Sequence, residues 1–276
     1  MAQTFNLQLS KQRCVKYRKA ILALSKQVPA LHIGPAYSCL EMVDVIYHGL
    51  MRRDQQNTYK DTFILSKGHG CAVQYVVLHD LGILTDNDIK LFCLPGGCLG
   101  AHPDYEIPGV AASTGSLGHG LGLAVGMSYA NKLMKQDVNT YVIISDGELQ
   151  EGSTWEAIMM ASNLRLNNLT VFLDLNDRIT LEQISTKYPA FYPVVNKLEA
   201  FNWYVHEVDG HDARAVFKAG QDRSPNSPTF VVCHTVKGKG ISYMENIAIW
   251  HYRSPNSEEY QQALDELSTA EMGVVL

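Results

Sequence analysis

The stretch that most constrains the fold is residues 141–178, in which two apolar segments flank a helical pattern. The apolar segments are residues 141–144 and 169–173, and the helical pattern covers residues 148–166. This order is typical of a right-handed βαβ unit in a parallel sheet. Apolar runs and helical patterns continue to alternate along the chain. The sequence therefore predicts an α/β protein with a doubly wound parallel sheet flanked by helices.

Asp146 and Asn176 follow the two apolar runs, so we expect both side chains at the carboxyl ends of neighbouring strands. Open α/β sheets bind ligands at this edge. Adjacent strands lie about 4.8 Å apart, so two short oxygen-bearing side chains there can reach one Mg²⁺. A Mg²⁺ ion with few protein ligands completes its shell with phosphate oxygens and water. The stretch therefore suggests a Mg²⁺–diphosphate site, although Asp-Gly after a strand is also common turn chemistry.

The composition is that of a globular protein, with 46% hydrophobic and 18% charged residues. The net charge of −5 argues against a nucleic-acid or anionic-membrane surface. No run approaches the roughly 18 apolar residues of a membrane span, and residues 1–14 lack the apolar core of a signal peptide. The six cysteines form no CxxC pair, and we expect reduced, mostly buried thiols in a cytoplasmic protein. Without repeats or linkers, residues 1–276 are expected to form a single domain.

Several histidines stand in glycine- or proline-rich loops, among them His32, His69, His102 and His251. His69 stands in a turn between an expected strand and helix, where free backbone N–H groups favour an anion. Residues 113–122 contain four glycines, which allow a backbone to lie against a ligand, but they lack the spacing of a Walker loop. On local grounds alone, His69 fits a helix-capping role about equally well, and a histidine in a loop such as that of His32 is usually solvated or packed.

The hydrophobic periodicity predicts further helices at residues 8–26, 38–51, 71–81, 85–92, 121–133, 187–201, 213–219 and 257–267. The helix at 38–51 is expected to be capped by Ser38 with Glu41. Strands are expected at residues 62–65, 203–208 and 229–234, and loops at 30–38 and 94–110.

These residues together closely resemble the N-terminal half of a transketolase, in order and spacing, from about residue 15 to 265. The matching motifs are Ala-Leu-His-Ile-Gly (30–34), Leu-Ser-Lys-Gly-His-Gly (65–70), Ala-His-Pro (101–103), Thr-Gly-Ser-Leu-Gly-His-Gly (114–120), Asp-Gly-Glu-Leu-Gln-Glu-Gly-Ser-Thr-Trp-Glu-Ala (146–157) and Thr-Val-Lys-Gly-Lys-Gly (235–240) with a later Trp-His (250–251). One such motif is weak, but this many in register identify the chain as a member of the family.

The resemblance implies thiamine diphosphate and a divalent ion, Mg²⁺ or Ca²⁺. It assigns the metal to Asp146, Asn176 and the backbone carbonyl of Arg178. It assigns the diphosphate region to the Gly147 N–H, His69 and His251, and the aminopyrimidine to Gly115 and Leu117. His32 and His102, with His251 as a further catalytic candidate, would face the substrate and move protons on sugar hydroxyls, which suits the near-neutral pKa of histidine. Glu151 resembles a carboxylate of the family's subunit interface.

The resemblance also implies that the pyrimidine-binding and C-terminal domains are absent. The chain would then be the cofactor-binding subunit of a split transketolase, active only with a partner chain that carries the pyrimidine domain, in a heterotetramer with two copies of each chain. The pair would transfer a two-carbon ketol unit from a ketose or its phosphate to an aldose or its phosphate. The chain departs from the family pattern at Pro35, Ser145, Asp177 and Arg178. The charged residues Asp177 and Arg178 are expected to alter the wall near the thiazolium, and the departures leave cofactor binding in place but the substrate open.

Other interpretations stay open at this point. One is a subunit recruited to an acyloin-forming or acyl transferase that uses the same cofactor. Alpha chains of oxo-acid dehydrogenases share the diphosphate motif but lack the Ala-His-Pro and Trp-His motifs. A non-catalytic assembly protein on the same fold would have no need of Asp146, Asn176 and the histidines.

Overall fold

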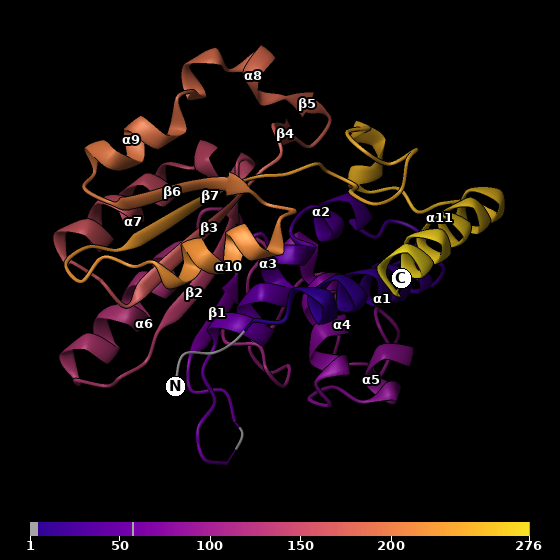
Figure 1. Cartoon of the computed structure of the whole chain (residues 1–276), viewed down its shortest axis with the longest axis horizontal. Coiled ribbons are helices and arrows are strands. Elements are labelled where there is room, and N and C mark those ends of the chain that lie inside the picture. The colour runs from indigo at the N-terminus through magenta and orange to yellow at the C-terminus, as the bar shows by residue number, and fades with distance from the viewer. Residues whose placement is uncertain (1–4, 57, 276) are drawn as a thin grey trace.

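The computed structural model describes residues 5–56 and 58–275, and a five-stranded parallel sheet lies at its centre (Figure 1). Residues 1–4 of the N-terminal segment considered above lie outside the described residues. The strands are β1 (Thr62–Leu65), β2 (Thr140–Ser145), β3 (Leu169–Leu175), β6 (Tyr204–Asp209) and β7 (Thr229–His234), in the spatial order β1-β2-β3-β7-β6. The predicted βαβ unit is confirmed, because β2 and β3 are parallel neighbours with Ser145 opposite Asp174.

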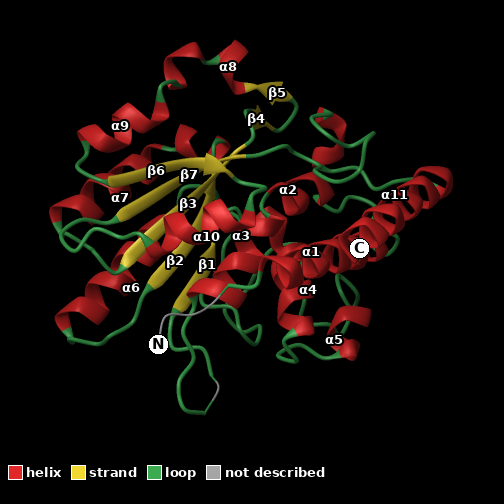
Figure 2. Cartoon of the chain, viewed as in Figure 1, coloured by secondary structure: helices red, strands yellow, loops and turns green. Residues whose placement is uncertain are grey.

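Helices pack on both faces of the sheet, which confirms the doubly wound architecture (Figure 2). The core on one face contains residues of α1 (Leu7–Leu24), α2 (Ile33–Ser38), α3 (Leu40–Val45), the π-helical turn η1 (Ile46–Leu50), α4 (Cys71–Asp80) and α10 (Ala213–Gln221). The core on the other face contains residues of α6 (Gly120–Leu133), α7 (Gly152–Asn163) and α9 (Val194–Ala200). Further elements are α5 (Asp86–Lys90), α8 (Ile184–Lys187), α11 (Ser257–Val275) and the 3₁₀ turns η2 (Gly68–Gly70), η3 (Gly147–Gln150), η4 (Pro189–Phe191) and η5 (Ala248–His251).

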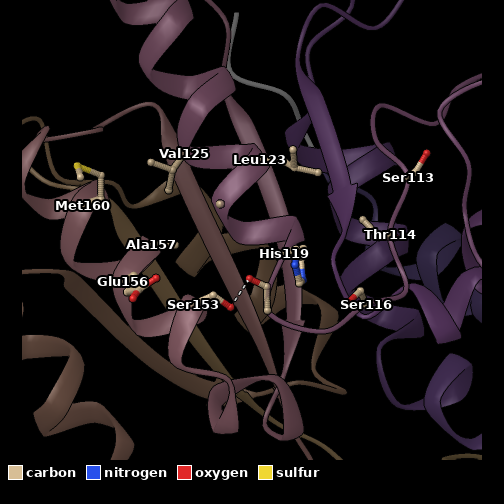
Figure 3. A pocket seen from close by; sticks show the side chains of 12 residues that line it. Ser113, Thr114, Ser116, His119, Leu123, Val125, Ser153, Glu156, Ala157 and Met160 are labelled. Atoms are coloured by element: carbon tan, nitrogen blue, oxygen red, sulfur yellow. Dashed lines mark hydrogen bonds between the residues drawn. The ribbon is translucent and has the colours of Figure 1, made fainter.

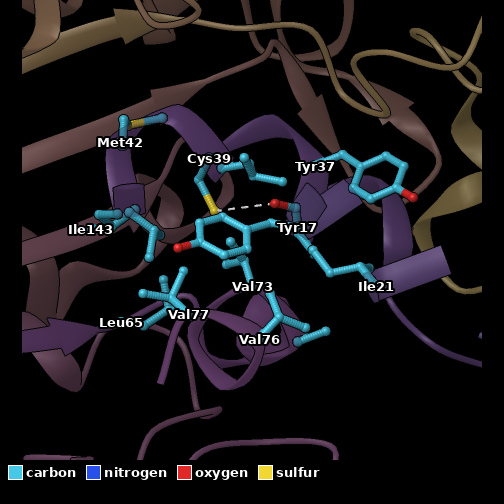
Figure 4. Packing of buried hydrophobic residues seen from close by; sticks show 14 of the residues in the cluster. Tyr17, Ile21, Tyr37, Cys39, Met42, Leu65, Val73, Val76, Val77 and Ile143 are labelled. Carbon is cyan, nitrogen blue, oxygen red and sulfur yellow. Dashed lines mark hydrogen bonds between the residues drawn. The ribbon is translucent and has the colours of Figure 1, made fainter. Parts of the chain in front are cut away.

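The two cores follow from the period of two along each strand, because successive side chains point to opposite faces. Leu65 and Ile143 belong to the core with α1 and α4, and Figure 4 shows them close to the α4 residues Val73 and Val77. Their strand neighbours Ile64, Val142 and Ile144 belong to the other core. A sheet covered on both faces needs apolar residues at every position, which explains the continuous apolar runs in the sequence.

The expected single helix at residues 38–51 is wrong in its start and its cap. The chain already turns helical at Ile33, so the expected loop is α2, and Cys39 separates α2 from α3. Ser38 caps nothing, because its hydroxyl donates to Asp174 Oδ2 at 2.6 Å. The Ser38 hydroxyl, which local sequence patterns predict as a helix cap, is therefore used instead to bond the buried Asp174 carboxylate.

The helix expected at residues 148–166 begins with η3, and extended backbone at Glu151 (ψ 128°) separates η3 from α7. The helix expected at residues 187–201 is divided into α8, η4 and α9. Pro189 stands at the start of η4 and Pro193 at the N-cap of α9, and neither proline donates the N–H that a continuous helix needs.

The cysteine prediction is confirmed, since all six cysteines are free and four of them are buried, while Cys93 and Cys98 are exposed. Within residues 5–56 and 58–275, no helix combines the length and apolar character needed to span a bilayer.

Candidate active site

A pocket of about 240 Å³ lies at the carboxyl edge of the sheet, where β2 and β3 end. Its lining residues are His32, Pro35, Lys67, His69, His102, Gly115, Leu117, Ser145, Asp146, Gly147, Asn176, Arg178, Ile179, Thr180, Lys237 and His251. Loops that follow β1, β2, β3 and β7 meet here because the carboxyl ends of parallel strands lie at one edge. The pocket brings together every metal-binding, cofactor-binding and catalytic candidate that the sequence predicted.

Three imidazoles surround the ring of His32 in this pocket. The His32 ring centroid lies 5.5 Å from that of His69, 6.2 Å from that of His102 and 5.2 Å from that of His251. His102 is exposed, whereas the other three rings are half-buried. The exposed ring therefore marks the mouth of the pocket and the others its interior.

Burial keeps the interior histidines neutral. It lowers the pKa of His32 and, more strongly, that of His69. The pKa of His251 falls to about 3, first because of burial and then because of the nearby Lys237 charge. A neutral imidazole has one nitrogen that donates and one that accepts. The Nδ1 of His251 is buried and has no hydrogen-bond partner among the described residues, so it is available to a ligand.

The position of His102 is set by α4 and by the glycine-rich loop. The Tyr75 hydroxyl lies 2.9 Å from the His102 carbonyl oxygen and 3.2 Å from the Gly100 carbonyl oxygen. Gly115 has φ +141°, and a Cβ there would lie 2.7 Å from His102 Cδ2. Only glycine therefore lets the loop lie directly against the His102 ring.

The carboxylate of Asp146 is completely buried and joins the ends of β2 and β3. Its Oδ1 accepts from the Gly147 N–H at 2.8 Å, and its Oδ2 accepts from the N–H groups of Asn176 at 3.0 Å and Arg178 at 3.3 Å. Burial raises the pKa of this carboxyl, and the nearby Asp174 charge raises it further. A cation beside Asp146 would act in the opposite direction and lower the pKa of this carboxyl.

The donor set fits a hard cation. Asn176 Oδ1 is buried, and no described residue donates a hydrogen bond to it. An unsatisfied amide oxygen beside a carboxylate is the kind of ligand pair that Mg²⁺ or Ca²⁺ binds. No group of three or more His, Cys, Asp or Glu side chains in the described part of the chain is arranged to hold a metal. A cation here would accordingly depend on phosphate oxygens and water for the rest of its shell.

Two lysines of the pocket were not singled out by the sequence reasoning. Lys67 is 1% exposed and forms an ion pair with Asp174, and it donates to the Pro35 carbonyl at 2.9 Å. Burial alone would lower the pKa of Lys67, but the Asp174 charge outweighs it and the pKa is raised. Its place in the Ser-Lys-Gly-His motif was the only available signal, and a lysine beside glycine usually indicates an exposed loop.

Lys237 is the second of these lysines, and it has a different environment. Lys237 is 3% exposed, and its Nζ forms no hydrogen bond or ion pair with the residues that the structure describes. Burial lowers its pKa, although the Asp146 charge acts in the opposite direction. An ammonium group that lines a pocket and bonds to no described residue is suited to an anionic ligand.

Asp177 does not itself line the pocket. It has φ +60°, and its carboxylate accepts from Ser185 N–H at 2.7 Å, Gln183 Nε2 at 2.8 Å and the Tyr192 hydroxyl at 2.9 Å. These bonds hold a small antiparallel hairpin of β4 (Arg178–Ile179) and β5 (Glu182–Gln183).

Ile179 and Thr180 of this hairpin line the pocket, and the sequence reasoning did not include them. Arg178 lines the pocket as expected. Ser145, another departure from the family pattern, accepts a hydrogen bond from the Glu148 N–H at 3.3 Å and so supports the turn after β2.

A larger hollow of about 800 Å³ is lined by residues of the glycine-rich loop (residues 113–119), α6 and α7 (Figure 3). Figure 3 shows Leu123 and Val125 of α6 and Met160 of α7 beside it, and Ser153 donates to the Gly118 carbonyl at 2.9 Å. Its exposed lining includes Leu123 (44%) and Met160 (51%), so the surface is largely apolar. Its one carboxylate, Glu156, is exposed, and no amide or lysine side chain lines it, so the smaller pocket is the candidate active site.

The fold and the pocket together define a doubly wound α/β protein with a polar pocket at the carboxyl edge of its parallel sheet, the edge at which open α/β sheets bind ligands. The sequence profile of the transketolase thiamine diphosphate-binding domain matches residues 10–268. The chain therefore belongs to the transketolase family, as the sequence motifs predicted.

Similar proteins agree with this assignment. One subunit of an apulose-4-phosphate transketolase from Phocaeicola vulgatus is 35% identical over 258 residues, which cover 92% of each chain. The SqwG subunit of a 6-deoxy-6-sulfo-D-fructose transketolase from Clostridium sp. is 33% identical, with 86% of this chain and 88% of that one covered. A transketolase from Campylobacter jejuni superposes with a TM-score of 0.86 at 23% identity, which shows the shared fold. The alignment spans 98% of this chain but 46% of the Campylobacter chain.

Proposed function

We propose that the chain is the cofactor-binding subunit of a two-chain transketolase, folded as one domain, and that it is active only when a partner chain supplies the pyrimidine domain. The observation that carries the proposal is the pocket at the carboxyl edge of β2 and β3. There an unpartnered Asn176 amide oxygen, the Asp146 carboxylate and the unpaired Lys237 lie together.

Thiamine diphosphate with Mg²⁺ or Ca²⁺ is the group that these residues would hold. Asp146, the Asn176 amide and the backbone carbonyl of Arg178 are proposed as metal ligands. When bound, thiamine diphosphate supplies the carbanion chemistry that cleaves and forms a carbon–carbon bond next to a carbonyl. The unsatisfied Asn176 oxygen supports a metal, and the unpaired Lys237 cation supports a diphosphate beside it.

The remaining pocket residues would orient the group and move protons. The Gly147 N–H, His69 and His251 are proposed to contact the diphosphate region, and Gly115 and Leu117 to hold the aminopyrimidine through backbone atoms. His251 keeps a free, neutral Nδ1 for a hydrogen bond.

His32 and His102 are proposed to face the sugar, with His251 as a third candidate. Their rings lie close to one another, and His102 is exposed at the mouth of the pocket. A neutral imidazole accepts a proton from a hydroxyl at one nitrogen and donates from the other, so the cluster suits proton movement on sugar hydroxyls.

The proposed partner is a transketolase chain that carries the pyrimidine domain, in a heterotetramer with two copies of each chain. The similar proteins from Phocaeicola and Clostridium are described as subunits of transketolases, which supports a two-chain enzyme. The apolar hollow beside α6 and α7 supplies a surface for assembly. Glu151 is exposed near it and is proposed to lie at the interface between the chains. We place the complex in the cytoplasm.

The proposed substrates are a ketose or ketose phosphate as donor and an aldose or aldose phosphate as acceptor, and the transferred group is a two-carbon ketol unit. The sugar names of the two subunit relatives support phosphorylated or otherwise anionic sugars. An acyloin or acyl transferase is not favoured, because both of those relatives are described as transketolase subunits.

The test is a calorimetric titration of the purified chain, alone and mixed with its partner, with thiamine diphosphate and Mg²⁺. Asp146→Ala should abolish Mg²⁺-dependent binding, while Asp265→Ala on the exposed face of α11 serves as the matched control. Ketol transfer should be absent for the chain alone and appear on mixing. Full activity of the isolated chain, or unchanged affinity in Asp146→Ala, would contradict the proposal.

A further inference from the structure

His211 lies outside the pocket, yet two hydrogen bonds connect it to the loop that carries Lys237. Its Nδ1 lies 3.0 Å from Glu41 Oε2, and its Nε2 lies 2.9 Å from the backbone nitrogen of Val236. Val236 directly precedes Lys237 in the chain. The side chain of His211 is 13% exposed, so solvent competes weakly for these bonds.

The two bonds fix the tautomer of His211. A backbone N–H can only donate, so Nε2 must accept from Val236 and carries no proton. The proton of the neutral ring is then on Nδ1, which donates to the Glu41 carboxylate. The ring is thus oriented at both nitrogens, and exchange of its tautomer would lose both bonds.

Glu41 extends the connection to the far end of the same loop. The Arg18 guanidinium donates to Glu41 Oε1 at 2.6 Å, and its Nε donates to the Lys239 carbonyl oxygen at 2.9 Å. Arg18 and Glu41 are 6% and 8% exposed, so this is a buried charge network. The backbone is therefore held at Val236 and at Lys239, on either side of Lys237.

Two backbone bonds hold the middle of the loop. The Gly238 N–H donates to the Gly34 carbonyl at 3.2 Å, and the Asn246 N–H donates to the Lys237 carbonyl at 2.8 Å. Lys237 is left with its backbone fixed on both sides and its ammonium group without a partner in the described residues. Such preorganisation reduces the entropy lost when an anion binds.

We propose that His211 is a positioning residue, which orients the Lys237 loop so that the ammonium group meets the anionic end of the ligand. The inference rests on the proposed function, since Lys237 matters here as a contact of the diphosphate. The network of Arg18, Glu41 and His211 would then affect ligand affinity, although none of its three side chains lines the pocket.

The test compares His211→Leu with His211→Gln in the full chain mixed with its partner. Glutamine retains a carbonyl oxygen that accepts from Val236 and an amide that donates to Glu41, whereas leucine retains neither. Loss of a buried hydrogen bond of this kind predicts about tenfold weaker binding of thiamine diphosphate with Mg²⁺ for His211→Leu, and a change of at most about twofold for His211→Gln. His234→Leu is the matched control, because exposed His234 bonds Glu207 near the same loop.

A double-mutant cycle with Lys237→Gln separates positioning from general stability. If His211 acts through Lys237, His211→Leu should have little further effect on affinity in the Lys237→Gln background. Inorganic pyrophosphate with Mg²⁺ is the second probe, and it should show the same pattern because it lacks the thiamine rings. The melting temperature of each variant, measured without ligand, controls for partial unfolding.

The outcomes are distinguishable. Weakened binding in His211→Leu, rescue in His211→Gln and non-additivity with Lys237→Gln support the inference. Normal affinity in His211→Leu, or full additivity with a weakened Lys237→Gln, overturns it and leaves the proposed function intact. Absence of thiamine diphosphate binding by the wild-type complex overturns both.

Discussion

Asp146 at the end of β2 accepts a hydrogen bond from the backbone N–H of Asn176 at the end of β3, at 3.0 Å. The carboxylate is therefore used by the protein itself, while the Asn176 amide oxygen is buried and unsatisfied. Both residues lie at the carboxyl edge of the sheet. The Asp146 side chain stabilises the fold, whereas the Asn176 amide oxygen bonds to no described residue and is available to a ligand.

This difference predicts opposite behaviour of the two side chains on substitution. Asn176→Ala should change the unfolding free energy of the ligand-free chain by less than about 1 kcal/mol, because its oxygen makes no bond to lose. The same change should remove Mg²⁺-dependent binding of thiamine diphosphate. Thermal unfolding with and without cofactor and Mg²⁺ measures both effects in one experiment. A large loss of stability in the ligand-free variant would contradict the prediction.

Tyr75→Phe should misplace His102 without disturbing the cofactor end of the pocket. The substitution removes the hydroxyl that lies near the Gly100 and His102 carbonyls, at a cost of about 1–3 kcal/mol of stability. We expect kcat of the complex to fall more than the cofactor affinity. Tyr105→Phe, at a residue 69% exposed, is the control. Equal loss of kcat and cofactor affinity would argue against this role.

Asp174→Asn should be strongly destabilising, by about 3–5 kcal/mol, because it leaves the buried Lys67 ammonium uncompensated. Replacing both partners, as in Lys67→Met with Asp174→Leu, should recover part of that loss. The control is Asp137→Asn, at an exposed aspartate that pairs with both Lys60 and Arg52, and it should cost less than Asp174→Asn because water screens these pairs. Urea denaturation of the ligand-free chain measures all three. Similar costs for the two aspartates would refute the argument.

Glu41 should make the stability depend on pH in the acid range. Burial opposes its charge, but Arg18 and His211 outweigh burial and lower its pKa from 4.5 to about 2. The stabilisation is therefore fully present above pH 4.5 and is lost as the pH falls from 4.5 through about 2. A shift of this size corresponds to about 3 kcal/mol.

Glu41→Gln should lack this part of the pH dependence and should be less stable than the wild type at neutral pH. Urea denaturation at several pH values between about 5 and 2.5 measures the slope. Glu258→Gln on the exposed first turn of α11 is the control. Parallel slopes for Glu41→Gln and the wild type would contradict the assignment.

Much of the pocket was predictable because strand ends and loop motifs are local. Asp146 and Asn176 follow apolar runs, and parallel pairing brings such positions to one edge regardless of the residues between them. The conformation of Asp177 was not predictable. Its φ of +60° and its bonds to Gln183, Ser185 and Tyr192 depend on a short hairpin that has no recognisable hydrophobic period in the sequence. The same holds for Ser38, whose partner Asp174 lies 136 residues away.

The lysines illustrate a second limit of sequence reasoning. A lysine beside glycine is typical of an exposed loop, and only the packing around Lys67 and Lys237 reveals that both are buried. His211 was also passed over, since its importance comes from a chain of contacts that joins α1, α3 and the loop after β7. Contacts between segments so distant in the chain leave no pattern of spacing.

The glycine-rich loop has a consequence for how the assembled protein responds to its ligands. Gly115 and Leu117 line the small pocket, whereas Ser116 and Gly118, between and beside them, line the larger apolar hollow. One layer of backbone is therefore the wall of both cavities. A molecule that immobilises the loop from one side also immobilises it for the other, and thermodynamic linkage requires the coupling to be equal in both directions.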